Sequence, residues 1–345
     1  MNSTSTLTRQ RVATFRVAAL LTVFTFIVGT AVSLPAQALP DGDDGLRYDQ
    51  SFAQAPPIAH NTWTKGASLP TPVFAPAAAL FQNEIYVIGG ASANNVVVDN
   101  VQIYTPSTKK WSTGVPYPTA IEFPSLAVVN SVLYGFGGSS DGVNPTAAVW
   151  AYNSTTKKWS SKAPLPTARW GTVAVVEKGI IYVIGGSLDT SGNGDLATVE
   201  SYNPSTNTWK EEASLLVAGS ESAAALFGTT IVVADGGTNG GGATGENESY
   251  NAVSNQWTAL VADPLSRYGS CFGAIGGKLY DAGGANAPSD TEAYQFSSNT
   301  WASLAAIPQS TIYPASAVYE NQLYCFGGWA SWEGSIINNT QIYQP

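Results

Sequence analysis

The sequence contains few of the residues on which enzymes most often depend. Its 345 residues include one histidine, His60, one methionine and two cysteines, Cys271 and Cys325. Serine and cysteine nucleophiles are usually activated by a histidine, and we expect His60 to lie at the surface, so a Ser-His-Asp or Cys-His relay is excluded. Two cysteines are also too few for a fold that depends on a disulfide framework.

Charged residues are scarce as well, and most of them are acidic. They make up 11% of the chain, with 15 basic and 24 acidic residues and a net charge of −9. A scattered negative charge keeps a protein soluble and disfavours binding to nucleic acid or to anionic membranes. Because 44% of the residues are apolar and 11% are aromatic, the composition indicates a folded chain rather than a disordered one.

The first 38 residues predict a secretory signal peptide. A basic start with three arginines precedes an apolar run over residues 17–32, and the small residues Ala36 and Ala38 follow at the spacing that signal peptidase accepts. The run has 16 residues, fewer than the roughly 20 that a membrane-spanning helix needs. We therefore expect cleavage after Ala38 rather than a retained anchor, and a secreted protein with no membrane attachment. Cleavage leaves 12 basic against 24 acidic residues, a net charge of −12.

The rest of the chain is dominated by an internal repeat. Tryptophans recur at intervals of 48, 48, 50, 48 and 44 residues, at Trp63, Trp111, Trp159, Trp209, Trp257 and Trp301. Double glycines that end apolar runs recur in nearly the same frame, at Gly89-Gly90, Gly137-Gly138, Gly185-Gly186, Gly236-Gly237, Gly283-Gly284 and Gly327-Gly328. A tyrosine precedes five of the tryptophans by seven residues, and Tyr343 repeats that position at the C-terminus. These markers predict six copies of one unit, which form a single domain over residues 60–345 after a linker at 39–59.

Each unit is predicted to form four short strands. In the third unit, strand-like runs cover residues 170–176, 180–184, 197–202 and 208–211, and Gly, Pro and Asn lie between them. No window after the signal peptide has a 3.6-residue apolar period, so helices are not expected. The recurring tyrosines and tryptophans are interpreted as structural plates between neighbouring units.

Units with these features resemble the kelch repeat, and the resemblance extends from Trp63 to Tyr343. The double glycine, the tyrosine and tryptophan seven residues apart, and proline-rich connectors such as residues 165–169 match the pattern of that family. The resemblance implies an all-β, six-bladed β-propeller of four-stranded blades. The last unit lacks a fourth strand, and residues 61–65 form a fourth strand that no first, second and third strand precede in the sequence. The N-terminal strand should therefore complete the C-terminal blade and close the ring.

The order of the strands predicts where a ligand could bind. The long loops after the double glycines and the connectors between units fall on one face of the ring. There, ten and eleven residues after each tryptophan, the chain enters the innermost strand at the mouth of the central channel, where kelch proteins commonly hold ligands. The candidate binding residues are Phe74, Glu122, Arg169, Trp170, Glu221, Arg267, Tyr268, Tyr313 and Trp329. For the two arginines, capping of neighbouring carbonyl groups is an equal alternative. Glu200, Glu248 and Glu292 each stand two residues before a repeat tyrosine, which favours a recurring interblade hydrogen bond.

Two functions remain open at this point. The first is a secreted, monomeric, non-catalytic propeller that binds a glycan, a cell-wall component or a protein partner at its loop-rich face, without a cofactor. Galactose oxidase, an enzyme with a similar propeller, needs two histidines for its copper, which His60 alone cannot supply. The alternative is a sugar-active enzyme similar to the sialic-acid epimerases, in which Glu122 and Glu221 act as acid and base and the arginines hold an anion.

The two cysteines permit two interpretations. Cys271 belongs to the first strand of the fifth unit and Cys325 to the second strand of the sixth, where it should pair with Ser316 across its hairpin. They would lie at similar depth in adjacent blades, and an oxidising compartment favours a disulfide. A bond requires Cα atoms within about 7 Å. Two buried thiols that act as small apolar groups are the alternative.

Overall fold

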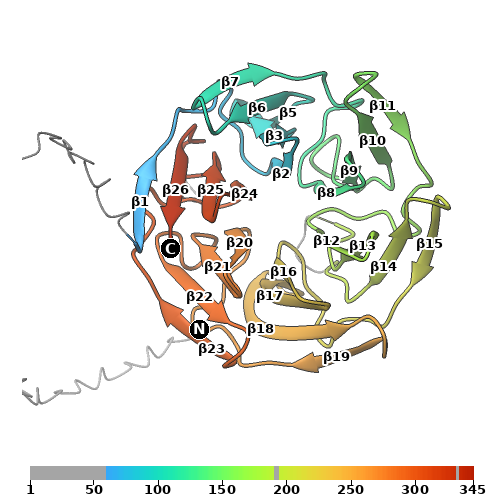
Figure 1. The fold of residues 1–345 in the computed structure, drawn as a ribbon, viewed down its shortest axis with the longest axis vertical. Helices are drawn as coiled ribbons and strands as arrows, with labels where there is room; N and C mark the ends of the chain where they lie inside the picture. Colours follow the sequence, from blue (N-terminus) through green and yellow to red (C-terminus); the bar gives the residue numbers. More distant parts are fainter. Residues whose placement is uncertain (1–59, 190–193, 332–333) are drawn as a thin grey trace, which may run out of the picture. The chain divides into compact units, whose positions relative to one another are not determined.

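The computed structural model describes residues 60–189, 194–331 and 334–345. They form a ring of six four-stranded antiparallel sheets (Figure 1). The helical content of these residues is one short 3-10 turn, Ala93–Asn95, and none of it is long and apolar enough to cross a membrane. The expected all-β, six-bladed propeller is confirmed. The predicted signal peptide (1–38) and linker (39–59) lie outside the described residues.

Each blade runs from an inner strand at the channel to a fourth strand at the rim (Figure 1). The inner strands are β2 (Ala77–Phe81), β8 (Ser125–Val129), β12 (Val173–Glu177), β16 (Ala223–Phe227), β20 (Cys271–Ile275) and β24 (Ala315–Tyr319). The second strands are β3 (Glu84–Ile88), β9 (Val132–Phe136), β13 (Ile180–Ile184), β17 (Thr230–Thr238), β21 (Lys278–Ala282) and β25 (Gln322–Phe326). The third strands are β6 (Val101–Thr105), β10 (Val149–Asn153), β14 (Val199–Asn203), β18 (Gly242–Asn251), β22 (Thr291–Gln295) and β26 (Thr340–Gln344). The fourth strands are β7 (Lys110–Thr113), β11 (Lys158–Ser161), β15 (Thr208–Glu211), β19 (Gln256–Ala259), β23 (Thr300–Ser303) and β1 (Thr62–Lys65). A small extra pair, β4 (Ala91–Ser92) and β5 (Val96–Val97), lies in the loop of the first blade.

The ring closes as the sequence predicts. Strand β1 pairs antiparallel with β26, and Trp63 lies opposite Tyr343. The sixth blade therefore takes three strands from the C-terminus and one from the N-terminal side of the domain. His60 is exposed beside this seam, with its Nδ1 atom 2.6 Å from the Pro345 carbonyl oxygen. The sixth blade is thereby four-stranded, like the other five.

The recurring tyrosines and tryptophans are structural, as expected. In every blade the two rings pack together, with centroids 4.9–5.2 Å apart. Each indole N–H also donates to a carbonyl of the preceding blade, as Trp111 does to Ala67 at 2.9 Å and Trp63 does to Ala305 at 2.9 Å. The equivalent bonds are made by Trp159, Trp209, Trp257 and Trp301. The tryptophans therefore join all six blades into one ring.

The double glycines lie where neighbouring blades approach most closely. A Cβ atom on Gly137 would be 2.3 Å from the Arg169 carbonyl oxygen, and Gly138 donates its N–H to that same oxygen at 3.1 Å. The fourth blade departs from the expected frame. There the equivalent bond to Arg267 O comes from Gly236, at 2.8 Å, so the first glycine position is occupied by Asp235 with φ 61°. The expected pair Gly236-Gly237 is thus displaced by one residue.

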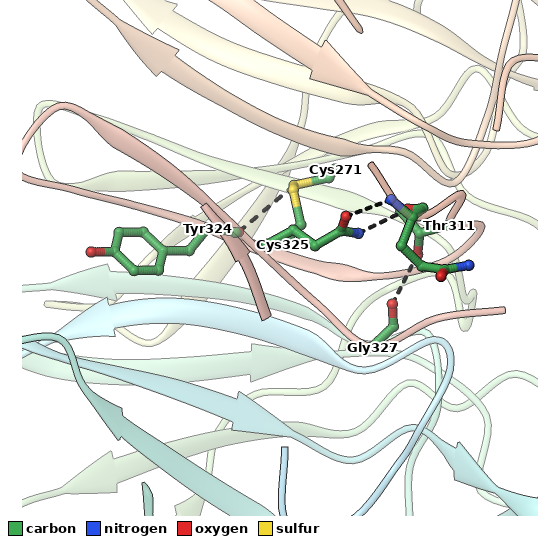
Figure 2. The surroundings of a disulfide bond; sticks show 7 residues. Cys271, Thr311, Tyr324, Cys325 and Gly327 are labelled. Carbon is green, nitrogen blue, oxygen red and sulfur yellow. Dashed lines mark hydrogen bonds between the residues drawn. A yellow bond between two sulfur atoms is a disulfide. The ribbon is translucent and has the colours of Figure 1, made fainter. Parts of the chain in front are cut away.

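Cys271 and Cys325 form a disulfide between the fifth and sixth blades (Figure 2). Their Cα atoms are 5.7 Å apart, within the range for such a bond. Cys325 pairs with Ser316 across its hairpin, as expected. Both cysteines are buried in an apolar cluster formed by the fifth and sixth blades. Of the two interpretations left open by the sequence, the structure selects the disulfide.

Replacing both cysteines by alanine is expected to lower the free energy of unfolding by about 4 kcal/mol, because the bond closes a long loop in the unfolded chain. The cysteines are 54 residues apart in sequence. Urea unfolding followed by tryptophan fluorescence measures the loss, and reduction of the parent protein should reproduce it. An unchanged midpoint in both cases would contradict the bond.

Candidate functional site

The connectors between blades and the loops after the glycines meet on one face, here called the loop face. The residue three positions before each inner strand forms a single β-bridge with the residue that follows the glycines, as Glu122 does with Ser139 and Trp170 does with Ser187. These residues surround the channel mouth and are here called the outer ring. The outer ring consists of Phe74, Glu122, Trp170, Ser220, Tyr268 and Ile312. Four of the sequence-based candidates belong to it.

The next residue of each blade forms a second ring, here called the inner ring. Its members are Ala75, Phe123, Gly171, Glu221, Gly269 and Tyr313. All six have positive φ angles, between 52° and 64°. Each backbone N–H donates to the carbonyl of the equivalent residue in the preceding blade, with N to O distances of 2.6–3.1 Å, so the six bonds form a closed circle. Left-handed residues other than glycine are uncommon and often mark functional positions.

Sequence reasoning did not find this circle, although a signal for it exists. Each member stands twelve residues after a repeat tryptophan, for example Phe123 after Trp111. The side chains alternate around the ring, because the long ones come from every second blade. A Cβ atom on Gly269 would be 2.2 Å from Cδ1 of Tyr313, and one on Gly171 would be 3.0 Å from Cγ of Glu221. The small residues therefore make room for the large ones.

The three long side chains of the inner ring meet across the channel. The rings of Phe123 and Tyr313 are in an edge-to-face arrangement with centroids 5.0 Å apart. The Tyr313 hydroxyl donates to the Glu221 carboxyl, and the Tyr268 hydroxyl is hydrogen-bonded to Tyr313. A cavity of about 260 Å³ extends along the inner strands, with Leu126 and Phe272 on its wall. The channel therefore contains a space whose wall has both apolar and polar side chains, Glu221 among them.

The mouth has an aromatic floor of six side chains. They are Phe74, Phe123, Trp170, Tyr268, Tyr313 and Trp329. Their contacts are continuous, from the stacked pair Phe74 and Trp329 at 4.2 Å to the tilted pair Phe123 and Trp170 at 4.7 Å. The structure thus brings together all five aromatic candidates from the sequence and adds Phe123. Most of these rings are half-buried, so part of each faces solvent.

Two carboxyl groups border the aromatic floor, and burial raises the pKa of both. Glu122 is 7% exposed, and its burial, with a smaller contribution from the charge of Asp141, raises its pKa to about 7. Burial raises the pKa of Glu221 to about 8, against the opposing effect of the Tyr313 hydrogen bond. In the described ranges neither carboxyl forms an ion pair. Both groups therefore hold a proton for part of the time near neutral pH.

The two arginine candidates do not reach the mouth. Arg169 is fully buried and its guanidinium donates to Glu200 at 2.5 Å, to Val183 O at 3.0 Å and to Thr167 O at 3.2 Å. Of the two interpretations of Arg169, the structure supports carbonyl capping and corrects the expectation of ligand contact. The reason is that both terminal nitrogens of the guanidinium, Nη1 and Nη2, are bonded inside the blade.

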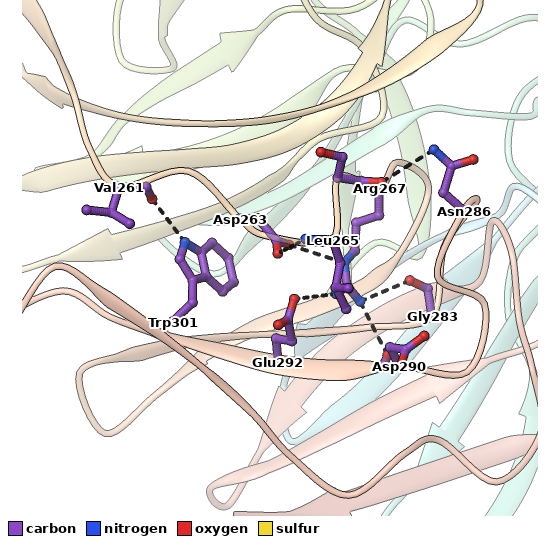
Figure 3. A network of polar contacts seen from close by, with 10 residues as sticks. Val261, Asp263, Leu265, Arg267, Gly283, Asn286, Asp290, Glu292 and Trp301 are labelled. Atoms are coloured by element: carbon purple, nitrogen blue, oxygen red, sulfur yellow. Dashed lines mark hydrogen bonds and ion pairs between the residues drawn. The ribbon is translucent and has the colours of Figure 1, made fainter. Parts of the chain in front are cut away.

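Arg267 occupies the same position in the fifth blade and is also fully buried (Figure 3). Its guanidinium lies 2.7 Å from Glu292 and 3.3 Å from Asp263. Asp235 and Asp281 interact electrostatically with it as well, so one cation serves four buried carboxyl groups. Burial raises the pKa of Asp235, Asp281 and Glu292, the last to about 8. Arg267 therefore belongs to a structural network and is not offered to a ligand.

The recurring glutamates also differ in detail from the expectation. Glu200 and Glu292 bind the arginines, and Glu248 accepts the Leu216 N–H at 2.8 Å. Gln102 and Gln341 make equivalent bonds to their connectors. Each bond joins a connector to the third strand of the blade that the connector enters, so the predicted bond exists but lies within one blade. In the part of the chain that the structure describes, no group of three or more His, Cys, Asp or Glu residues is arranged to hold a metal.

The fold defines a six-bladed propeller of four-stranded blades, and three comparisons agree with this class. Residues 57–220 match the family model for the KLHDC2/KLHL20/DRC7 Kelch-repeats domain. A segment of 65 residues is 42% identical to Kelch-like protein 35 of Mus musculus and spans 19% of this chain and 11% of that protein. A solved chain titled "Structure of YjhT" is similar with a TM-score of 0.69 and 18% identity over 79% of this chain and 95% of that chain. These similarities agree with the observed kelch-type β-propeller fold.

Proposed function

We propose that this chain is an exported, non-catalytic binding protein that holds a glycan of a cell wall or cell surface on its aromatic floor. The single observation that carries the proposal is the continuous group of six aromatic side chains at the mouth. Binding sites combine apolar, aromatic surfaces with a few converging polar groups. Here the rings offer flat faces to a sugar, and Glu122, Glu221 and the tyrosine hydroxyls offer hydrogen bonds to its hydroxyl groups.

The surroundings of the floor support a docking surface on this face. Exposed large apolar side chains recur in the loops after the glycines and in the connectors. They include Val96 (55% exposed), Val143 (59%), Leu188 (45%), Leu216 (55%) and Leu265 (38%). Apolar groups that gather around a concave, polar-rimmed surface often mark an interaction site. A long ligand could therefore extend from the mouth across the loops.

Two observations support export. The N-terminal sequence has the order of a secretory signal, and the buried disulfide between Cys271 and Cys325 is of a kind that is rare in reducing compartments. Most of the exposed surface is polar but uncharged, since only 11% of residues carry a charge. The mature protein is expected in the extracellular space.

Replacing Trp170 or Trp329 by alanine is expected to weaken glycan binding by about 30-fold, because each removes a large ring from the floor. A glycan array identifies the ligand, and isothermal titration calorimetry measures the change. Tyr319→Ala is the matched control, since Tyr319 ends β24 at the opposite face. Equal losses in the control and in the mouth variants, or no glycan bound at all, would overturn the proposal.

An acid–base enzyme is the second candidate, and one observation favours it. Glu221 carries a raised pKa and lies within hydrogen-bonding reach of Tyr313, which is linked to Tyr268. The anion clamp that this candidate requires is missing from the mouth, because both arginines are buried elsewhere. NMR of a bound sugar over hours separates the candidates. Turnover that Glu221→Gln abolishes would establish an enzyme, whereas binding without turnover supports the proposed function.

A further inference from the structure

The carboxyl groups of the mouth have no cationic partner. Glu122 and Glu221 form no ion pair with the described residues, and the charges that act on them come from Asp141 and Asp195, which are acidic. Buried carboxyl groups are normally paired, because an isolated charge in a low-dielectric environment is costly. Glu122 is more than nine-tenths buried, and the described residues provide no hydrogen bond to its carboxyl group. The mouth thus holds two carboxyl groups whose ionised forms receive no counter-charge from the described part of the propeller.

The exposed charges are unevenly divided between the two faces, and the acidic ones favour the face that holds Glu122 and Glu221. Five of the seven exposed lysines lie in or beside the tight turns of the face opposite the loops, at Lys109, Lys110, Lys157, Lys158 and Lys178, whereas Lys65 and Lys210 lie on fourth strands. Exposed carboxylates lie in loops on the loop face, at Asp99, Asp141 and Asp290, whereas Glu320 lies on the opposite face. Such a distribution makes the loop face electronegative and draws cations toward the channel. The charge of the whole face therefore agrees with that of its centre.

The aromatic floor is also suited to a cation. A ring attracts an ammonium group that lies over its face, by roughly 0.5–1 kcal/mol at exposed sites and about 2 kcal/mol when water is excluded. The floor presents phenylalanine, tyrosine and tryptophan rings in continuous contact, and Glu122 and Glu221 belong to the same two rings of residues around the mouth. π-faces and carboxyl groups together form the usual surroundings of a bound alkylammonium group. A neutral or anionic sugar would use only part of this arrangement.

We propose that the mouth selects glycans that carry free amino groups, with the ammonium held over the aromatic floor beside the carboxyl group of Glu122 or of Glu221. The inference rests on the proposed function, since it names the kind of glycan that the floor binds. An amino sugar offers a ring face for stacking and a cation for the carboxylates. An N-acetylated sugar keeps the ring face and loses the cation.

The test compares three tetrasaccharides of the same linkage, built from glucosamine, N-acetylglucosamine or glucose. Titration calorimetry on the purified protein at pH 7 should show the glucosamine tetramer binding at least about tenfold more tightly than the other two. Raising the salt concentration should weaken the binding of the glucosamine tetramer alone, because only that contact involves a charge pair. In the Glu122→Gln/Glu221→Gln variant the preference for the glucosamine tetramer over the glucose tetramer should fall below about twofold. Glu320→Gln, on the opposite face, is the matched control.

Each outcome distinguishes the inference from the proposed function. Equal affinity for the three tetramers would overturn the amino-group preference and leave glycan binding intact. A preference that survives in the double glutamine variant would also overturn it, because the cation would then bind elsewhere. If no tetramer binds but the peptide acetyl-Gly-Lys-Gly-amide does, both proposals are overturned, since the mouth would then recognise a cation of a protein partner.

Discussion

A chain that begins at Thr71, and so lacks β1, is expected to lose its cooperative unfolding transition. The deletion removes the strand paired with β26, the ring of Trp63 packed on Tyr343 at 5.0 Å, and the indole bond from Trp63 to Ala305. Loss of a packed tryptophan side chain alone costs roughly 3–5 kcal/mol, and a whole domain is stable by only about 5–15 kcal/mol. Circular dichroism during heating, compared with the chain that begins at His60, measures the effect.

The exposed edge of β26 gives this prediction a second readout. Unpaired backbone groups along Thr340–Gln344 would offer an edge to other chains, so the truncated protein should form oligomers on gel filtration. Addition of a peptide that covers residues 60–70 should restore both the transition and the monomeric size of the reference. A truncated chain that melts within a few degrees of the reference would show that closure does not depend on β1.

Arg267→Met is expected to destabilise the propeller by roughly 3–5 kcal/mol at neutral pH, because it removes the cation from a buried network. Four buried carboxyl groups face Arg267, those of Asp235, Asp263, Asp281 and Glu292. The matched control is Arg169→Met, at the same position two blades away, where the paired carboxyl is that of Glu200. The loss for Arg267→Met should exceed that for Arg169→Met. Urea unfolding of both variants measures the difference, and equal losses would contradict the role of the additional carboxyls.

The pH dependence of stability gives a further check on this network. Burial raises the pKa of Glu292 to about 8 and also raises the pKa of Asp235 and Asp281. A carboxyl with a raised pKa binds more protons in the folded state, so its contribution to stability is present at low pH and is lost as the pH rises toward 8. The parent protein should therefore be more stable near pH 5 than near pH 8. In Arg267→Met the loss of stability between pH 5 and pH 8 should be larger, because no cation remains in the network to favour the ionised forms of the carboxyl groups.

The architecture could be predicted from the sequence because its markers are local and repeated. The positions of Trp63 and Tyr343 in the repeat were enough to predict how the ring closes. The N-terminal strand has no neighbouring strands of its own and the last blade lacks a fourth strand, so the two must pair. The loop face followed from the order of strands in a blade. Phe74, Trp170 and Tyr268 were found because each stands eleven residues after a repeat tryptophan, and Trp329 was found because it follows the last double glycine.

The roles of the arginines could not be predicted, because their orientation depends on residues far away in sequence. Arg267 and Asp235 are 32 positions apart in the sequence, and only the left-handed backbone of Asp235 brings that carboxyl into the network. The repeat predicts the double glycine at Gly236-Gly237, so Asp235 was not recognised as part of this turn. The inner ring was missed for a similar reason, since its bonds involve backbone groups and leave no mark in side-chain chemistry.

The inner ring has a consequence for how such a mouth can diverge. Its circle of bonds involves only backbone N–H and C=O groups, so the circle does not depend on whether a blade contributes Ala75, Glu221 or Tyr313. Substitutions at these positions can therefore change what the mouth recognises while the closure of the channel is retained. The backbone sets one limit, because φ angles of 52–64° exclude proline and disfavour β-branched residues. Recognition and folding are thus assigned to different atoms of the same six residues.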